Sequence, residues 1–140
     1  LRTEIRQTLD MELSPPDGEV SDAARDHYMD RTRERKDLLA AYEEELVDLI
    51  EHEADPFARL DAEITLAEVY LEQADVADRT WLPDHWPDRR VRRVVRRLEA
   101  KADVARDKAR MVQGIAETEA ARLGNRAGPL LGRLAHLDGG

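Results

Sequence analysis

Residues 86–123 read WPDRRVRRVVRRLEAKADVARDKARMVQGIAETEAARL, and their pattern decides the fold. Apolar and small side chains recur along this stretch in steps of three and four residues, which is the spacing of one helical face. They are Val91, Val95, Leu98, Ala102, Ala105, Ala109, Val112, Ala116 and Leu123. The pattern predicts one long helix whose seam packs lengthwise on other helices.

The composition of the chain predicts a thin core. The chain has 140 residues, which suits one domain; 38% of them are charged and only 4% are aromatic. Alanine supplies much of the apolar content, and each buried alanine removes little surface from water. We therefore expect closely packed helices rather than a core of large side chains.

Charge and residue content exclude several classes of protein. The formal net charge of −9 disfavours a general nucleic-acid coat. The sequence has no cysteine, which excludes disulfides, zinc–thiolate sites and thiol catalysis. No apolar run reaches the roughly 18 residues of a membrane span. The first residues lack the apolar core of a signal peptide, so we expect a cytoplasmic protein; they also lack an initiating methionine, which is compatible with a start inside a longer chain.

Cap and turn signals divide the chain into four helices. A short amphipathic helix over 2–13 ends at the prolines and glycine of 14–18. Ser21 is a good N-cap for a helix over 21–54, and Asp55-Pro56 provides the cap and first position of a helix over 56–78. After a proline-rich link, the helix over 87–123 ends at Gly124-Asn125. We expect 124–140 to be a loose tail with one or two helical turns at its leucines.

These elements predict an all-α fold in one helical domain of 1–140, an antiparallel bundle of three main long helices with a short N-terminal helix and coiled-coil-like packing. At about 1.5 Å per residue the three long helices run to roughly 50, 35 and 55 Å, so the middle one cannot cover its neighbours. We expect the N-terminal helix and a second subunit to fill the gap, and a dimer is favoured. The predicted self-association seam consists of Ala102, Ala105, Ala109, Val112 and Ala116.

No group of residues predicts catalysis, a cofactor or a metal. A di-metal bundle needs Glu-x-x-His on two helices, and none of the four histidines follows a glutamate at that spacing. Asp48 and His52 share a helix face with Glu45, and we interpret them as a solvated acidic face. The two serines lie at a proline turn and a helix cap rather than in a nucleophile elbow. Trp81 and Trp86 are interpreted as apolar covers of the bundle end. We expect that the protein is not an enzyme.

The one anomaly is the run of arginines at the start of the last long helix. Cations at a helix N-terminus oppose the macrodipole and repel one another, so an anionic partner is expected. We favour salt bridges across a helical hairpin, for example from Arg92 to Glu72. Nucleic-acid phosphates and an acidic protein are the other two possibilities. The residues predicted to contact an anion or a nucleic acid are Arg89, Arg90, Arg93 and Arg97.

The sequence thus predicts a non-enzymatic helical assembly or adaptor module that acts through self-association and protein–protein contacts. The alternative is a nucleic-acid-binding accessory, the helical part of a transcription regulator, which would use the arginine-rich helix start at 89–97.

Overall fold

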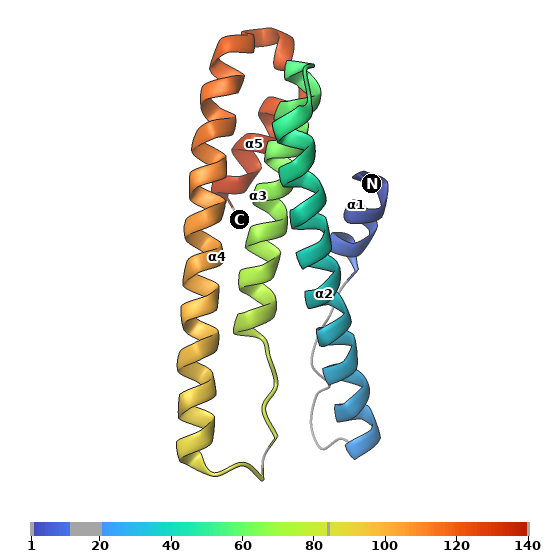
Figure 1. The fold of residues 1–140 in the computed structure, drawn as a ribbon, viewed down its shortest axis with the longest axis vertical. Helices are drawn as coiled ribbons and strands as arrows, with labels where there is room; N and C mark the ends of the chain where they lie inside the picture. Colours follow the sequence, from blue (N-terminus) through green and yellow to red (C-terminus); the bar gives the residue numbers. More distant parts are fainter. Residues whose placement is uncertain (1, 12–20, 84, 140) are drawn as a thin grey trace.

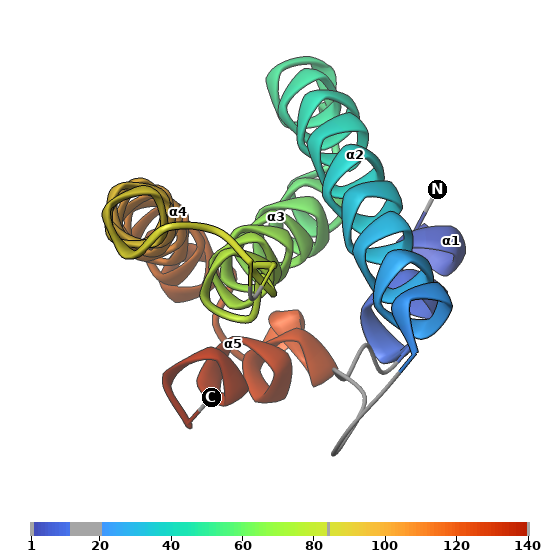
Figure 2. The same cartoon turned by 90° about the horizontal axis from the view of Figure 1, so that it is seen from below.

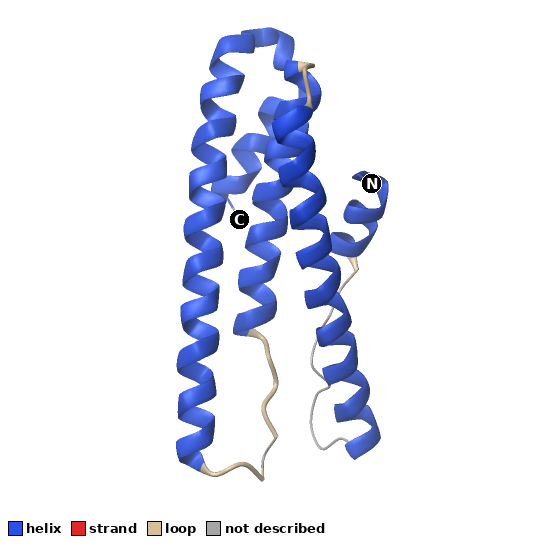
Figure 3. Ribbon diagram, in the orientation of Figure 1, coloured by secondary structure: helices blue, strands red, loops and turns tan. Residues whose placement is uncertain are grey.

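The computed structural model describes residues 2–11, 21–83 and 85–139, and helices account for most of them (Figure 3). No strand occurs within these ranges, and the expected all-α bundle is confirmed. The elements in chain order are α1 (Arg2–Asp10), α2 (Asp22–His52), α3 (Pro56–Asp78), α4 (Asp88–Leu123), the short 3₁₀ helix η1 (Gly124–Ala127) and α5 (Pro129–Gly139).

Helix α3 is the centre of the bundle. Figures 1 and 2 show α2 and α4 flanking it, with α5 packed on a further side. Because α1, α2, α4 and α5 all contact α3, its side chains are buried around most of its circumference; Leu60, Ile64 and Val69 are each 0% exposed. The two outer helices, α2 and α4, scarcely contact one another. The bundle therefore resembles an open layer with α3 recessed in the middle.

The helix ends form where the local signals predict them. The Ser21 hydroxyl accepts a hydrogen bond from the backbone N–H of Ala24 at 3.2 Å, and the Asp55 carboxylate accepts one from the N–H of Phe57 at 3.0 Å. Gly124 ends α4 at a φ of +60°, a conformation that favours glycine. Two predicted bounds were too long: α2 ends at His52 rather than 54, and α1 ends at Asp10. The proline break at 14–18 lies outside the described residues.

The register between α3 and α4 differs from that of a tight hairpin. Ala102 of α4 packs with Ala74 and Ala77 near the end of α3, so α4 starts roughly 20 Å beyond the end of α3. Residues 80–83 continue from the end of α3 toward the start of α4 without helical structure (Figure 1). The first three turns of α4 therefore have no α3 turn beside them.

The predicted loose tail of 124–140 is wrong, because α5 is docked on the bundle. Leu134 is only 7% exposed and packs in a cluster with Leu60 and Ile64 of α3. Arg133 donates hydrogen bonds to Glu68 at 2.6 Å and to the Thr65 hydroxyl at 3.1 Å. The apolar and basic side chains of α5 cover this face of α3, and the burial of these side chains stabilises α5.

The predicted self-association seam is also wrong as a free surface. Most of its members are buried in the chain's own bundle, where small side chains let α4 approach α3 closely, and Val112 is half-buried. Their exposed fractions are 0% for Ala102, 6% for Ala105, 2% for Ala109 and 0% for Ala116. The seam pattern marked the α3-facing side of α4, and a second subunit is not needed to cover it.

Helix α1 does not fill the space between the outer helices. Ile5 is 0% exposed and packs with Leu39 and Tyr42 of α2. Figure 2 shows α1 on the side of α2 that faces away from α4. The gap between α2 and α4 is therefore left open.

Candidate functional site

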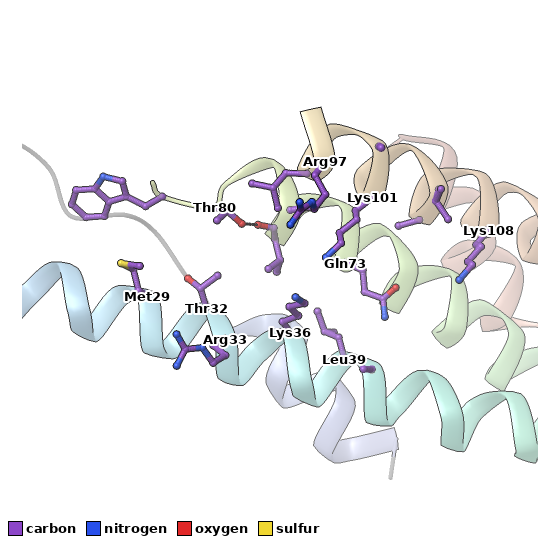
Figure 4. Close-up of a pocket in the computed structure, with 18 of the residues that line it drawn as sticks. Met29, Thr32, Arg33, Lys36, Leu39, Gln73, Thr80, Arg97, Lys101 and Lys108 are labelled. Carbon is purple, nitrogen blue, oxygen red and sulfur yellow. Dashed lines mark hydrogen bonds between the residues drawn. The ribbon is translucent and has the colours of Figure 1, made fainter. Parts of the chain in front are cut away.

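A groove runs between α2 and α4 with α3 as its floor; we call it the α2–α4 notch. Its volume is about 680 Å³. Leu39 of α2, Val76 and Ala77 of α3, and Leu98 and Val104 of α4 provide much of its apolar lining (Figure 4). The notch exists because α2 and α4 both pack on α3 but diverge from each other.

The rim of the notch is cationic. All three lysines of the sequence line it, together with two arginines. None of the described residues that line it is acidic, although acidic residues outnumber basic ones in the chain by 31 to 22. The five cations are Arg33, Lys36, Arg97, Lys101 and Lys108.

Lys36 and Lys101 form the centre of this positive field. They extend toward one another from opposite walls (Figure 4). The charge of Lys36 lowers the pKa of Lys101, with smaller contributions from burial and from Arg97. Two ammonium groups held this closely destabilise each other, and an anion between them would relieve the repulsion.

The other cations of the notch are only weakly engaged. Lys108 lies 3.9 Å from the Glu43 carboxylate and 5.7 Å from the centre of the Tyr70 ring. Arg33 lies 3.8 Å from Asp30 on its own helix, and both side chains are well exposed. Exposed pairs of this kind contribute about 0–1 kcal/mol, so these cations remain available to a partner.

An exposed apolar stripe continues from the notch along α4. Val104 lines the notch, and Met111 and Ile115 follow it at seven and eleven residues, which keeps them on the same side of the helix. Their exposed fractions are 53%, 70% and 54%. This side of α4 lies roughly 130° from the side that packs on α3, so the bundle leaves it uncovered.

The arginines of 89–97 form a second basic feature, which we call the arginine ridge. All six are exposed: Arg89, Arg90, Arg92, Arg93, Arg96 and Arg97. Arg90 stacks over the Trp86 ring at 3.8 Å. Within the described ranges, none of the six forms an ion pair with a carboxylate.

The salt bridges expected across the hairpin are therefore wrong. Glu72 is held by Arg35 at 3.3 Å and by Arg79 at 3.3 Å instead of by Arg92 or Arg96. The reason is the register: α4 passes the end of α3 near Ala102, so the ridge lies roughly 8–20 Å beyond the end of α3.

A buried carboxyl lies at the other end of the α3–α4 interface. Glu63 is 2% exposed, and its Oε2 has no hydrogen-bond partner within the described structure. Burial and the charge of Glu119 raise the pKa of Glu63 to about 7, against the opposing charge of Arg59. Arg59 donates to Glu119, with Nε at 3.0 Å, and lies 4.0 Å from Glu63. With its pKa raised to about 7, Glu63 is about half protonated at neutral pH, and it does not line the α2–α4 notch.

Asp48, Glu51 and His52 bring their ligand atoms within 4.8 Å of one another, but all three are exposed. The Nδ1–H of His52 donates to the backbone oxygen of Asp48 at 2.8 Å, and this bond and the Asp48 carboxylate raise the pKa of His52. The arrangement is that of a solvated acidic helix face.

Sequence reasoning found the ridge but missed the notch. Lys36 and Lys101 are 65 positions apart, and only the packing of both helices on α3 brings them together. The sequence contained one signal for the notch, the scarcity of lysine. The chain has three lysines, and all three line this groove.

None of the described helices is long and apolar enough to cross a membrane. Comparisons of the chain with protein-family models, with curated proteins and with solved structures found no match.

Proposed function

We propose that this protein is a non-enzymatic helical assembly module that acts through protein–protein contacts, and that its contact surface is the α2–α4 notch with the adjoining stripe of α4. The observation that carries the proposal is the exposure of Val104, Met111 and Ile115 beside an apolar groove. Exposed apolar side chains gathered beside an apolar groove and flanked by charged residues are typical of protein interaction sites.

The test measures the oligomeric state and its dependence on the stripe. Sedimentation between about 1 and 100 µM should show a species heavier than the 16.0 kDa chain. Met111→Gln with Ile115→Gln should weaken association at least about tenfold, because each side chain fully buried contributes roughly 1.5–3 kcal/mol. Leu131→Gln is the control, because Leu131 is exposed on α5 and does not line the notch. A 16.0 kDa species at every concentration would refute self-association.

A second candidate function is nucleic-acid binding by the arginine ridge. It is favoured by one observation, the exposure of six arginines that no described carboxylate neutralises. Arginine forks bind phosphate well, and each phosphate contact releases counterions, so binding to duplex DNA should weaken steeply with salt. A gel-retardation assay at about 50 mM salt decides: no retardation there removes this candidate.

A further inference from the structure

Between Arg33 and Glu51, one side of α2 carries basic residues before Ala40 and acidic residues after it. The side that lines the notch has Arg33, Lys36 and Ala40, and the same side continues upward along the helix at the same three- and four-residue spacing. Its continuation is acidic and apolar: Glu44, Val47 and Glu51. All six side chains are exposed, and Val47 is 38% exposed.

The two halves of this side are self-complementary about Ala40. In an antiparallel pair of such helices, a residue a given number of positions before Ala40 faces the residue the same number of positions after it. Lys36 then faces Glu44 of the partner subunit, and Arg33 faces the turn that carries the partner's Val47, next to the partner's Glu51. Each contact is made twice, and the small side chain of Ala40 permits close approach at the centre.

We propose that a second copy of this chain occupies the α2–α4 notch, with its α2 antiparallel to the first α2 about a twofold axis at Ala40. The inference rests on the proposed function and names its partner. The interface is isologous, so each copy inserts its α2 into the notch of the other.

At each height along the notch, the residues of its walls complement the residues that the partner's α2 would place there. Lys36 and Lys101 extend toward one another from the two walls, so their ammonium groups lie at about one height in the notch (Figure 4). The partner's Glu44 arrives at that height, which places a carboxylate between the two ammonium groups that now repel one another. The partner's Val47 arrives near Arg97 and the apolar Leu98, both of which line the notch.

The relative directions of α2 and α4 extend this charge complementarity along α4. α2 and α4 run the same way, since each is antiparallel to α3 (Figure 1). The acidic half of the partner's α2 therefore lies over the basic first half of α4. A duplex nucleic acid fits the notch less well, because the floor is apolar and the whole chain has a net charge of −9.

Charge exchange tests the pairing. Variant A carries Arg33→Glu and Lys36→Glu, and variant B carries Glu44→Lys and Glu51→Lys. Either variant alone places like charges opposite each other twice, and its dimer Kd should rise at least about 100-fold. An equimolar mixture should restore heterodimers with a Kd within about tenfold of the wild-type value, because A and B then present opposite charges at both contacts.

The matched control is Glu34→Lys with Glu45→Lys, which makes the same change of charge as variant B. Glu34 and Glu45 are exposed about 120° around α2 from the proposed interface side, so this variant should dimerise as the wild type does. Circular dichroism checks that all variants remain helical, which is expected because every altered residue is exposed.

Cross-linking tests the direction of the helices. The chain has no cysteine, so Ala40→Cys introduces a single thiol at the expected axis. Mild oxidation should join two copies, because a disulfide needs the two Cα atoms about 4.4–6.8 Å apart. Ala23→Cys is the control, because its mate would lie roughly 50 Å away in the antiparallel pair.

The outcomes separate the inference from the function on which it rests. A wild-type dimer that neither A nor B weakens, or whose A and B forms do not recombine, overturns the antiparallel pairing and leaves assembly in place. Cross-linking at Ala23 but not at Ala40 overturns it in the same way. A wild-type protein that is monomeric throughout overturns both.

Discussion

Replacing Glu63 with glutamine should stabilise the protein at neutral and alkaline pH and leave it little changed in mild acid. Glu63 is buried between α3 and α4, and its pKa is raised from 4.5 to about 7 by burial and by Glu119. The unfolded chain releases this proton near pH 4.5, whereas the folded protein holds it to about pH 7. Between these values the folded state binds more protons, so stability falls as pH rises.

The size of the change in stability follows from the shift in the pKa of Glu63. A change from 4.5 to about 7 is about 2.5 pH units, and each unit corresponds to about 1.4 kcal/mol. The ionised carboxylate therefore destabilises the fold by roughly 3–3.5 kcal/mol above pH 7, which is a large part of the stability of a typical domain, about 5–15 kcal/mol. Glutamine keeps the shape of the side chain but cannot ionise, so it should recover this free energy.

The assay is urea unfolding followed by circular dichroism at fixed protein concentration, at pH 4.5, 6 and about 8. As the pH rises over this range, the free energy of unfolding of Glu63→Gln should increase relative to that of the wild type, by up to about 3 kcal/mol. Glu99→Gln, at an exposed position on α4, should show no such trend. If Glu63→Gln is the less stable protein at pH 8, then Arg59 stabilises an ionised Glu63 and the reasoning fails.

Two further predictions concern the arginine ridge and the C-terminal helix. Replacing four ridge arginines together with glutamine should leave the melting temperature unchanged or raise it, because like-charge repulsion at a helix start is removed and no described salt bridge is broken; a fall at low salt, measured by circular dichroism, would show that the ridge stabilises the fold. The four are Arg92, Arg93, Arg96 and Arg97. Leu134→Ala should lower the free energy of unfolding by roughly 2–4 kcal/mol, because Leu134 is buried on α3. Leu131→Ala, at 39% exposure, should lower it by less than about 1 kcal/mol, and equal effects in a urea titration would contradict the docking of α5.

The positions of the helices could be predicted from the sequence because their signals act locally. Ser21 and Asp55 accept hydrogen bonds from backbone groups two or three residues later, and Gly124 adopts its positive φ within a single turn. Such interactions need no knowledge of the rest of the chain. The apolar spacing of 86–123 also marked the correct side of α4, although not what covers it.

What covers each helix depends on the register between distant elements. The pairing of Arg106 with Asp78 lets α4 start far beyond α3, which separates the ridge from the carboxylates of α3. A local pattern contains no information on how much of the link over 79–87 is extended. For the same reason the docking of α5 was not foreseen: it requires a matching apolar surface around Leu60 and Ile64.

The candidate site is a product of the tertiary structure alone. Lys36 and Lys101 are exposed side chains on their own helices. They come close to one another because α2 and α4 both pack on α3. Sequence thus determined where the three long helices begin and which side of α4 is apolar. Packing on α3 decided which charges face each other, because electrostatic interactions depend on distances that only the folded chain sets.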